Sequence, residues 1–320
     1  VTPQADFDDG RTQGPALFLI ELVRDGSTEV RHREAMQKAL DLLLEAQYPS
    51  GGWPQYYPLK GEGFSDLGNY RRYNHINDGS IPEIIRVLLE AYRAFGEQRY
   101  LDAVIRAADW LLEVRVPGAV WSQQYYDDYV MGPLKPNHPA PGRWFEPMSI
   151  TASETRSVVD VLTEVWLETG DERYIGPIDE IVDWYERSRL PDGRWARMYE
   201  LHTNRPIYCT PDKVITYSDD NLRPGYAWKG KWGESVLSQI KALKATTREE
   251  MLAKRAGVAE DSQLAALGKA ARNALDGLDD RGLWVVSQGP EAQNVRTGEF
   301  HDRMRDLCVY LEAVQGGGGD

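Results

Sequence analysis

Four basic side chains, Arg197, Arg205, Lys213 and Arg223, lie within a segment of 27 residues. The chain as a whole carries a net charge of −13, so a local cluster of basic side chains is notable. The planar guanidinium group of arginine matches the shape of a carboxylate. The segment is therefore a candidate for recognising carboxylates on a loop-rich face, and a solvated basic surface is the simpler alternative.

Acidic and amide side chains stand at two other loop ends. Asn77 and Asp78 come just before a predicted helix start, and Asp127 and Asp128 follow an extended segment at the corresponding place of a repeat. Oxygen ligands from separate loops suit Ca²⁺, which accepts about six to eight of them in flexible geometry. The alternative is that Asn77-Asp78-Gly79 is simply a turn. The five histidines are scattered and form no zinc motif.

Glu154 is a further candidate for a ligand or an acid. The tetrapeptide Thr151-Ala152-Ser153-Glu154 has the form of a capping box, which would account for this glutamate without any chemistry. Ser80-Ile81-Pro82-Glu83 has the same form, with Ser80 as the predicted N-cap and Pro82 in the first turn. We expect both tetrapeptides to begin helices.

An internal repeat indicates the elements that must position these residues. Residues 96–100 (GEQRY) and 170–174 (GDERY) each open an apolar run at helical spacing, and the two copies are 74 residues apart. A tryptophan follows the tyrosine after 21 residues in both copies. A looser copy runs from Leu40 to Trp53, and the weakest one ends at Trp284. Recurrence at a fixed offset is typical of a repeated supersecondary unit.

Apolar periodicity predicts a series of helix hairpins. The expected helices cover residues 18–22 with 36–44, 80–95 with 101–114, and 151–167 with 175–189. About three helices follow residue 230, the last near residues 304–311. Residues 131–147 form a long Pro-rich loop, and residues 203–230 are expected to be irregular. The predicted fold is mainly α, an incomplete α/α toroid of repeated hairpins whose short extended segments and long loops form a groove at one end.

Composition limits the organisation of the chain. With 320 residues and 42% hydrophobic content, we expect a single catalytic domain over residues 1–314 and a flexible Gly-rich tail over residues 315–320. No apolar run approaches the ~20 residues that a membrane span needs, so we expect a soluble chain. The negative net charge argues against a nucleic-acid partner, because such binding depends on basic residues that neutralise phosphates.

The aromatic and cysteine contents are also informative. Ten Trp and seventeen Tyr are many for this length, and aromatic surfaces suit sugar rings, although core packing accounts for most such residues. Cys209 and Cys308 are too few for a disulfide framework. We expect two free thiols, and a single bridge between them is the alternative.

Several motifs, in order along the chain, resemble those of pectate lyases of polysaccharide lyase family 10. They are residues 51–58 (GGWPQYYP), 74–79 (NHINDG), 121–125 (WSQQY), 145–147 (FEP) and 195–200 (WARMYE). The likeness runs from about Leu43 to Trp228. It implies a partly toroidal helical fold and calcium-dependent β-elimination of polygalacturonate.

The resemblance also implies roles for single residues. The catalytic arginine of the family falls on Arg197, and its substrate lysine falls on Lys213. Its acidic positions fall on Asp78 and on one of Asp127 and Asp128. The choice between the last two is open, because Tyr126 stands where an acidic residue is expected after Gln124-Tyr125. Asn77 accompanies Asp78 as a metal ligand. His75, Arg205 and Arg223 complete the predicted substrate-binding set.

Two other functions remain open at this stage. A glycoside hydrolase on the same toroid would use two carboxylates, for which Asp78 and Glu154 are candidates. A non-catalytic sugar-binding protein would use the tryptophan segments instead. On the first interpretation we expect Ca²⁺ as cofactor, an acidic polysaccharide as the partner without a membrane or protein partner, and a secreted or periplasmic location.

Overall fold

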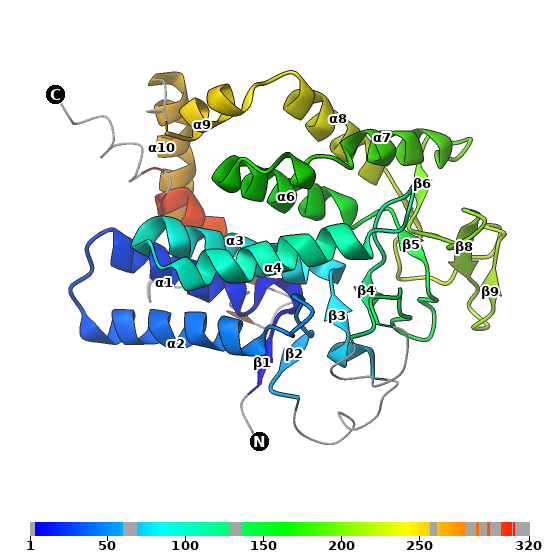
Figure 1. The fold of residues 1–320 in the computed structure, drawn as a ribbon, viewed down its shortest axis with the longest axis horizontal. Coiled ribbons are helices and arrows are strands. Elements are labelled where there is room, and N and C mark those ends of the chain that lie inside the picture. Colours follow the sequence, from blue (N-terminus) through cyan, green and yellow to red (C-terminus); the bar gives the residue numbers. More distant parts are fainter. Residues whose placement is uncertain are drawn as a thin grey trace.

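The computed structural model describes residues 4–59, 69–127, 136–256, 261–278, 286–287, 293–294, 302–308 and 310 (Figure 1). Its helices are α1 (Gln13–Arg24), α2 (Val30–Ala46), α3 (Ser80–Phe95), α4 (Gln98–Val114), α6 (Thr155–Thr169), α7 (Ile178–Arg187), α8 (Trp232–Lys244), α9 (Arg248–Ala256) and α10 (Asp261–Asp276). The predicted fold class, mainly α and an incomplete α/α toroid of helix hairpins, is confirmed. None of the helices in these ranges is both long and apolar enough to cross a membrane.

The helices divide into an inner and an outer set. The inner helices α1, α3, α6 and α8 contact one another in succession, α2 and α4 lie outside as partners of α1 and α3, and α7 packs against α8. Helix α3 is buried on most of its faces, which is typical of a helix surrounded by others. Helix α2 buries only a stripe made of Met36, Leu40, Leu43 and Ala46. Helix α3 is therefore enclosed more completely than α2.

The strands are short, and in Figure 1 the labelled ones lie on one side of the helices. They are β1 (Ala5–Asp6), β2 (Tyr56–Tyr57), β3 (Asn74–His75), β4 (Gln124–Tyr125), β5 (Ile150–Thr151), β6 (Trp195–Ala196), β7 (Met198–Tyr199), β8 (Pro206–Cys209), β9 (Ile215–Thr216), β10 (Lys229–Gly230), β11 (Val286–Ser287) and β12 (Gln293–Asn294). All pairings are antiparallel: β1 with β2, β3 with β4, β6 with β10, β11 with β12, and β5-β7-β8-β9 as one sheet.

The sheet β5-β7-β8-β9 corrects one sequence-based expectation. The interval from Thr203 to Gly230 is not irregular throughout, because it contains β8, β9 and β10. Ile207 of β8 pairs with Met198 of β7, and both side chains are buried. Burial of these apolar residues against the toroid therefore favours strands in a segment whose composition looks polar.

Both predicted capping boxes are wrong. The N-cap of α3 is Gly79, in the left-handed region at φ 73°, and the Ser80 hydroxyl donates to the carbonyl of Asn77 at 3.0 Å. The N-cap of α6 is Glu154 itself, with helical backbone angles and no side-chain cap. Tight turns precede both helices, so the hydroxyl residues bond within the turn instead of capping the first amides.

A buried tryptophan closes each of three repeats. The indole N–H of Trp53, Trp121 and Trp195 donates to the carbonyl ten residues earlier, which belongs to Leu43, Leu111 and Tyr185, at 2.7, 2.7 and 2.8 Å. These carbonyls lie in α2, α4 and α7, and all three indoles are fully buried. Each outer helix is thereby tied to the strand segment that follows it. The predicted Trp repeat is a structural repeat.

The offset of 74 residues also relates Trp110 to Trp184 and Tyr125 to Tyr199. Trp110 and Trp184 donate to the side-chain oxygens of Asn137 and Asn204, at 3.0 and 2.9 Å. Trp110 packs edge-on against Tyr125, and Trp184 packs in the same way against Tyr199. The two copies therefore share an aromatic core and a side-chain hydrogen bond.

The cysteines behave as expected. Cys209 is buried in β8, Cys308 is half-buried among residues 302–308, and both are free. The Gly-rich tail lies outside the described residues.

We predict that Trp121→Phe lowers the free energy of unfolding by about 2 kcal/mol. The change removes the donor that satisfies the buried Leu111 carbonyl and leaves a small void. Urea unfolding compares this variant with Trp144→Phe, an aromatic exchange at a side chain that is 52% exposed, for which we expect about 0.5 kcal/mol or less. Equal unfolding midpoints for the two variants would contradict the anchoring role of Trp121.

Candidate active site

Three equivalent backbone hydrogen bonds build the end of the toroid where the strands lie. The donors are the amides of Phe7, Ile76 and Ala152, and the acceptors are the carbonyls of Gln55, Gln123 and Arg197, each at 2.9 Å. Every acceptor stands two residues after an anchoring tryptophan. Arg197 therefore occupies a position that glutamine holds in the two preceding repeats.

The same register brings one acidic residue per repeat to this end. The residue two positions after each amide donor is Asp9, Asp78 or Glu154. These residues precede α1, α3 and α6, so each lies at the start of an inner helix. Asp9 and Asp78 have nearly the same left-handed backbone, with φ of 51° and 52°. The repeat thus places a carboxylate at the same turn of successive units.

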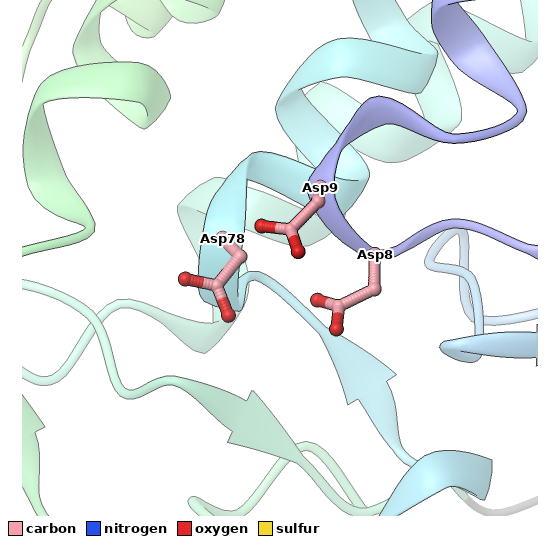
Figure 2. Close-up of side chains that lie close together, drawn as sticks. All are labelled: Asp8, Asp9 and Asp78. Atoms are coloured by element: carbon pink, nitrogen blue, oxygen red, sulfur yellow. The ribbon is translucent and has the colours of Figure 1, made fainter. Parts of the chain in front are cut away.

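Two of these carboxylates, Asp9 and Asp78, form a cluster with the neighbouring Asp8. The nearest side-chain oxygens of Asp8, Asp9 and Asp78 all lie within 4.8 Å of one another. Figure 2 shows the three side chains extending from two separate turns into a common space. Asp9 and Asp78 also line a cavity of about 290 Å³ next to Gln13 and Arg305. The cluster has the oxygen ligands and the access that a Ca²⁺ site needs.

The electrostatics of the cluster are uneven. Burial and the charges of Asp8 and Asp9 raise the pKa of Asp78, and His75 and Arg197 oppose the rise. For Asp8, burial acts upward but interactions with His75 and Arg11 outweigh it, so its pKa is lowered. Oxygen Oδ1 of Asp8 is buried and accepts no hydrogen bond from the residues that the structure describes. The cluster therefore concentrates negative charge that the described protein atoms satisfy only in part.

Two predicted residues flank the cluster. His75 is 2% exposed, and Nε2 lies 3.8 Å from Oδ1 of Asp8. Within the described part of the chain, neither ring nitrogen has a hydrogen-bond partner. Asn77 donates to the Asp78 carboxylate, and its own Oδ1 accepts a bond of 2.8 Å from Gln123. His75 and Asn77 thus position the carboxylates.

Arg197 is held on several sides. Its guanidinium lies 5.0 Å from the ring centres of both Tyr226 and Trp232. Nε donates to the carbonyl of Ala227 at 3.0 Å, and Nη1 donates to Oγ of Ser153 at 3.1 Å. The side chain is 17% exposed. It is therefore fixed in orientation while part of it still reaches solvent.

Glu154 links Arg197 to the acidic cluster. Its Oε1 lies 3.7 Å from Nη1 of Arg197 and accepts a short bond from Ser153. Burial raises the pKa of Glu154, and the charge of Asp78 adds to the rise, while Ser153, Arg197 and His75 act downward. Since no capping box holds it, this buried glutamate is part of the site.

The remaining basic residues divide into two groups. Nζ of Lys213 lies 5.4 Å from the Trp144 ring centre, and Cζ of Arg223 lies 5.5 Å from the same centre. Arg205 instead lies 3.7 Å from the ring centre of Tyr217, next to β9. Only two of the three predicted substrate-binding cations are thus brought together.

The second predicted acidic position lies apart from the cluster. Asp127 is 1% exposed and accepts hydrogen bonds from Ser50 and from Nδ2 of Asn74, the latter at 3.0 Å. It is not among the carboxylates that gather around Asp78 in the described ranges. Asp128 lies outside the described residues.

Sequence reasoning missed Asp8, Asp9 and Gln123. A signal for the aspartates was present, because Asp8-Asp9-Gly10 repeats the form of Asn77-Asp78-Gly79. A signal for Gln123 was present as well, since Trp-x-Gln occurs at Trp53 and Trp121 and Trp-x-Arg at Trp195. The role of Trp144 and Tyr226 depends on tertiary contacts that spacing does not reveal.

Comparison with known proteins agrees with this geometry. The model of the pectic acid lyase family matches residues 2–90 and 189–237, which contain Asp8, Asp9, Asp78 and Arg197. No curated protein sequence matches the chain.

Solved structures share the fold. A family 10 polysaccharide lyase from Cellvibrio cellulosa aligns with a TM-score of 0.63 and 23% identity over 76% of this chain and 82% of its own. A mutant of that lyase in complex with trigalacturonic acid aligns with a TM-score of 0.61 and 23% identity over 75% and 82%. Cellobiose 2-epimerase from Spirochaeta thermophila aligns with a TM-score of 0.52 and 11% identity over 98% and 87%.

The chain is therefore similar to the pectic acid lyase family over the two segments that hold the site, and to family 10 polysaccharide lyases in its fold. The resemblance to pectate lyases of polysaccharide lyase family 10 is confirmed, by a family model that matches both segments of the site and by the fold of the Cellvibrio enzyme.

We predict that Asp78→Asn stabilises the protein in chelator at neutral pH. A carboxyl whose folded pKa is raised favours folding most below its ordinary pKa, and stability falls as pH rises through the raised value. The uncharged amide of the new side chain does not ionise, so the variant avoids this loss of folding stability. Added calcium should then raise the melting temperature of wild type more than that of the variant.

The matched control is Asp212→Asn, which removes one exposed aspartate in the turn between β8 and β9. It should leave the response to calcium unchanged. An Asp78 variant less stable than wild type in chelator, with an unaltered calcium response, would show that the three carboxylates do not repel one another.

Proposed function

We propose that this protein is a pectate lyase, which cleaves polygalacturonate, the 1,4-linked α-D-galacturonan, by calcium-dependent β-elimination with Arg197 as the base. The observation that carries the proposal is the joint placement of Arg197 and the acidic cluster at one end of the toroid. The two segments that match the pectic acid lyase family contain both parts of this site. The trigalacturonic acid bound by the Cellvibrio mutant supports an acidic polysaccharide as substrate.

The chain offers a donor set that fits Ca²⁺. Asp8, Asp9 and Asp78 supply hard carboxylate oxygens from two turns, and the buried Oδ1 of Asp8 has no hydrogen-bond partner among the described residues. These three aspartates would hold the ion, with Asn77 supporting Asp78. When bound, the ion supplies positive charge that offsets a uronate carboxylate. Asp127 and Asp128 remain predicted ligands, either of a further metal ion or of the substrate.

The chain's own residues would carry the proton transfer. In β-elimination the C5–H bond breaks, its electrons form the C4–C5 double bond, and the C4–O4 bond breaks with its electrons on O4, which then gains a proton. Arg197 would receive the C5 proton. Ser153, Tyr226 and Trp232 hold its guanidinium in one orientation, so little reorganisation is needed when the proton moves.

An arginine base must lose its own proton first, and the ordinary pKa of arginine lies above about 12. In general, positive charge nearby and exclusion of water favour the neutral form of a basic group. Glu154 acts in the opposite direction when it is ionised, because it stands 3.7 Å from Nη1. Burial raises the pKa of Glu154 and so favours its neutral form, which lessens this opposition. The buried glutamate therefore adjusts the charge around Arg197.

Substrate binding would use cations beyond Arg197. Lys213 and Arg223 meet at Trp144 and would bind uronate carboxylates, while Arg205 and His75 stay predictions for the same task. A polymer of the cell exterior requires an enzyme that meets it there, so we propose a secreted or periplasmic location.

The direct test is the ultraviolet absorbance of the unsaturated product, followed on polygalacturonate with calcium and then with chelator. We expect absorbance to rise with calcium and to stop with chelator. New reducing ends without absorbance would identify a hydrolase that uses Asp78 and Glu154, and binding without turnover would identify a sugar-binding protein. Turnover that survives exhaustive chelation would disprove the metal assignment.

We predict that Arg197→Lys and Arg197→Ala each lower kcat by about 10³-fold or more. Lysine keeps a positive charge but lacks the planar fork that the site holds. Binding of an oligogalacturonate should weaken much less, because proton abstraction belongs to the transition state. Steady-state kinetics and calorimetry measure the two effects. A lysine variant with a kcat near that of wild type would reduce Arg197 to a carboxylate anchor.

A further inference from the structure

A continuous row of aromatic rings leads away from Arg197. Its guanidinium lies over Tyr226, Tyr226 packs edge-on against Phe145 at 5.0 Å, and Phe145 packs edge-on against Trp144 at 5.1 Å between ring centres. Each step is about as long as one ring, so Trp144 lies within the reach of a short oligosaccharide from Arg197. The row belongs to the loop before β5 and to the segment before β10.

Trp144 differs from the other rings in its exposure. It is 52% exposed, whereas its neighbour Phe145 is 5% exposed. Leaving an indole in water forgoes the free energy that its burial would give. Residues 91–188, which include Trp144, lie outside the match to the pectic acid lyase family. The family match therefore assigns no role to this side chain.

Two cations without acidic partners flank the exposed indole. Lys213 and Arg223 lie 5.4 and 5.5 Å from its ring centre, and neither pairs with a carboxylate in the part of the chain that the structure describes. Arg223 donates one long bond of 3.4 Å to the carbonyl of Pro224. Arg143, by contrast, is bound by the carboxylate of Glu146 through Nε at 2.9 Å. In a chain of net charge −13, two unneutralised cations mark a place for an anion.

We propose that Trp144 is the stacking platform of a distal uronate subsite, on which the indole packs against a sugar ring while Lys213 and Arg223 bind that sugar's carboxylate. This proposal rests on the proposed function and deepens it, because it names a unit of the substrate that is held away from the reacting bond. A neutral sugar would use the ring but leave both cations unpaired. An acidic polysaccharide uses both features.

The distance from the acidic cluster determines the kinetic signature. Trp144 contacts neither Arg197 nor the carboxylates in the interactions described above, so its contribution to binding is the same in the ground state and the transition state. Such uniform binding lowers KM and leaves kcat unchanged. Trp144→Ala should therefore raise KM for polygalacturonate about tenfold with kcat within about twofold of wild type.

The closing experiment measures binding of saturated hexagalacturonate by calorimetry, in chelator and with calcium. We expect Trp144→Ala to weaken binding about tenfold and Trp144→Phe about threefold or less, since phenylalanine keeps an aromatic face. Trigalacturonate is too short to occupy both the reaction centre and the distal subsite fully, so its affinity should fall less on Trp144→Ala. Fully methyl-esterified hexagalacturonate should bind weakly to all variants, because the two cations then lack a charge to neutralise.

The control is Val30→Ala, an exposed apolar residue at the start of α2, which should bind as wild type does. Equal affinity of wild type and Trp144→Ala for hexagalacturonate would overturn the subsite. Failure of wild type to bind hexagalacturonate under either condition would overturn both the subsite and the lyase function. Binding that depends on Trp144, without any unsaturated product from polygalacturonate, would overturn the lyase function alone.

Discussion

The hydrogen bond from a buried indole to a helix carbonyl ten residues earlier is the constraint on which the rest of the site depends. It fixes Trp53, Trp121 and Trp195 against the outer helices, and the residue two positions later then reaches the same place in each repeat. The carbonyl of that residue accepts a hydrogen bond from the segment just before an inner helix earlier in the chain, α1, α3 or α6, and so aligns that helix with it. One local contact, repeated, thereby brings together carboxylates and a guanidinium that are more than a hundred residues apart in the chain.

The repeats have equivalent frames but different chemistry. Glutamine at position 123 donates a hydrogen bond to Asn77 and so supports the acidic turn, whereas the equivalent Arg197 places a guanidinium beside Ser153 and Glu154. The acidic positions diverge in the same way. Asp9 and Asp78 join Asp8 in a cluster, while Glu154 lies beside Arg197. An asymmetric site thus arises from a nearly regular scaffold, because equivalent backbone positions at its end carry different side chains.

The helix hairpins and the equivalence of the tryptophans could be predicted from the sequence. The helix starts and the place of Trp144 could not, for physical reasons. The offset of 74 residues predicted the helix hairpins and the equivalence of Trp121 with Trp195, because burial preserves residue spacing. The capping boxes predicted at Ser80–Glu83 and Thr151–Glu154 were wrong, since a capping box and a tight turn use the same residue types and differ only in backbone angles. Trp144 gave no signal, because exposure and cation contacts depend on three-dimensional packing.

The central claim is that the site removes a proton from the sugar instead of adding water to the bond. It is tested most directly by cleaving a defined oligogalacturonate in water labelled with the heavy oxygen isotope and weighing both products by mass spectrometry. Elimination makes no new bond to solvent oxygen, so the account predicts no label at the cleaved linkage and one product lighter by a water molecule than its hydrolytic counterpart. One heavy oxygen incorporated for each bond broken would contradict it.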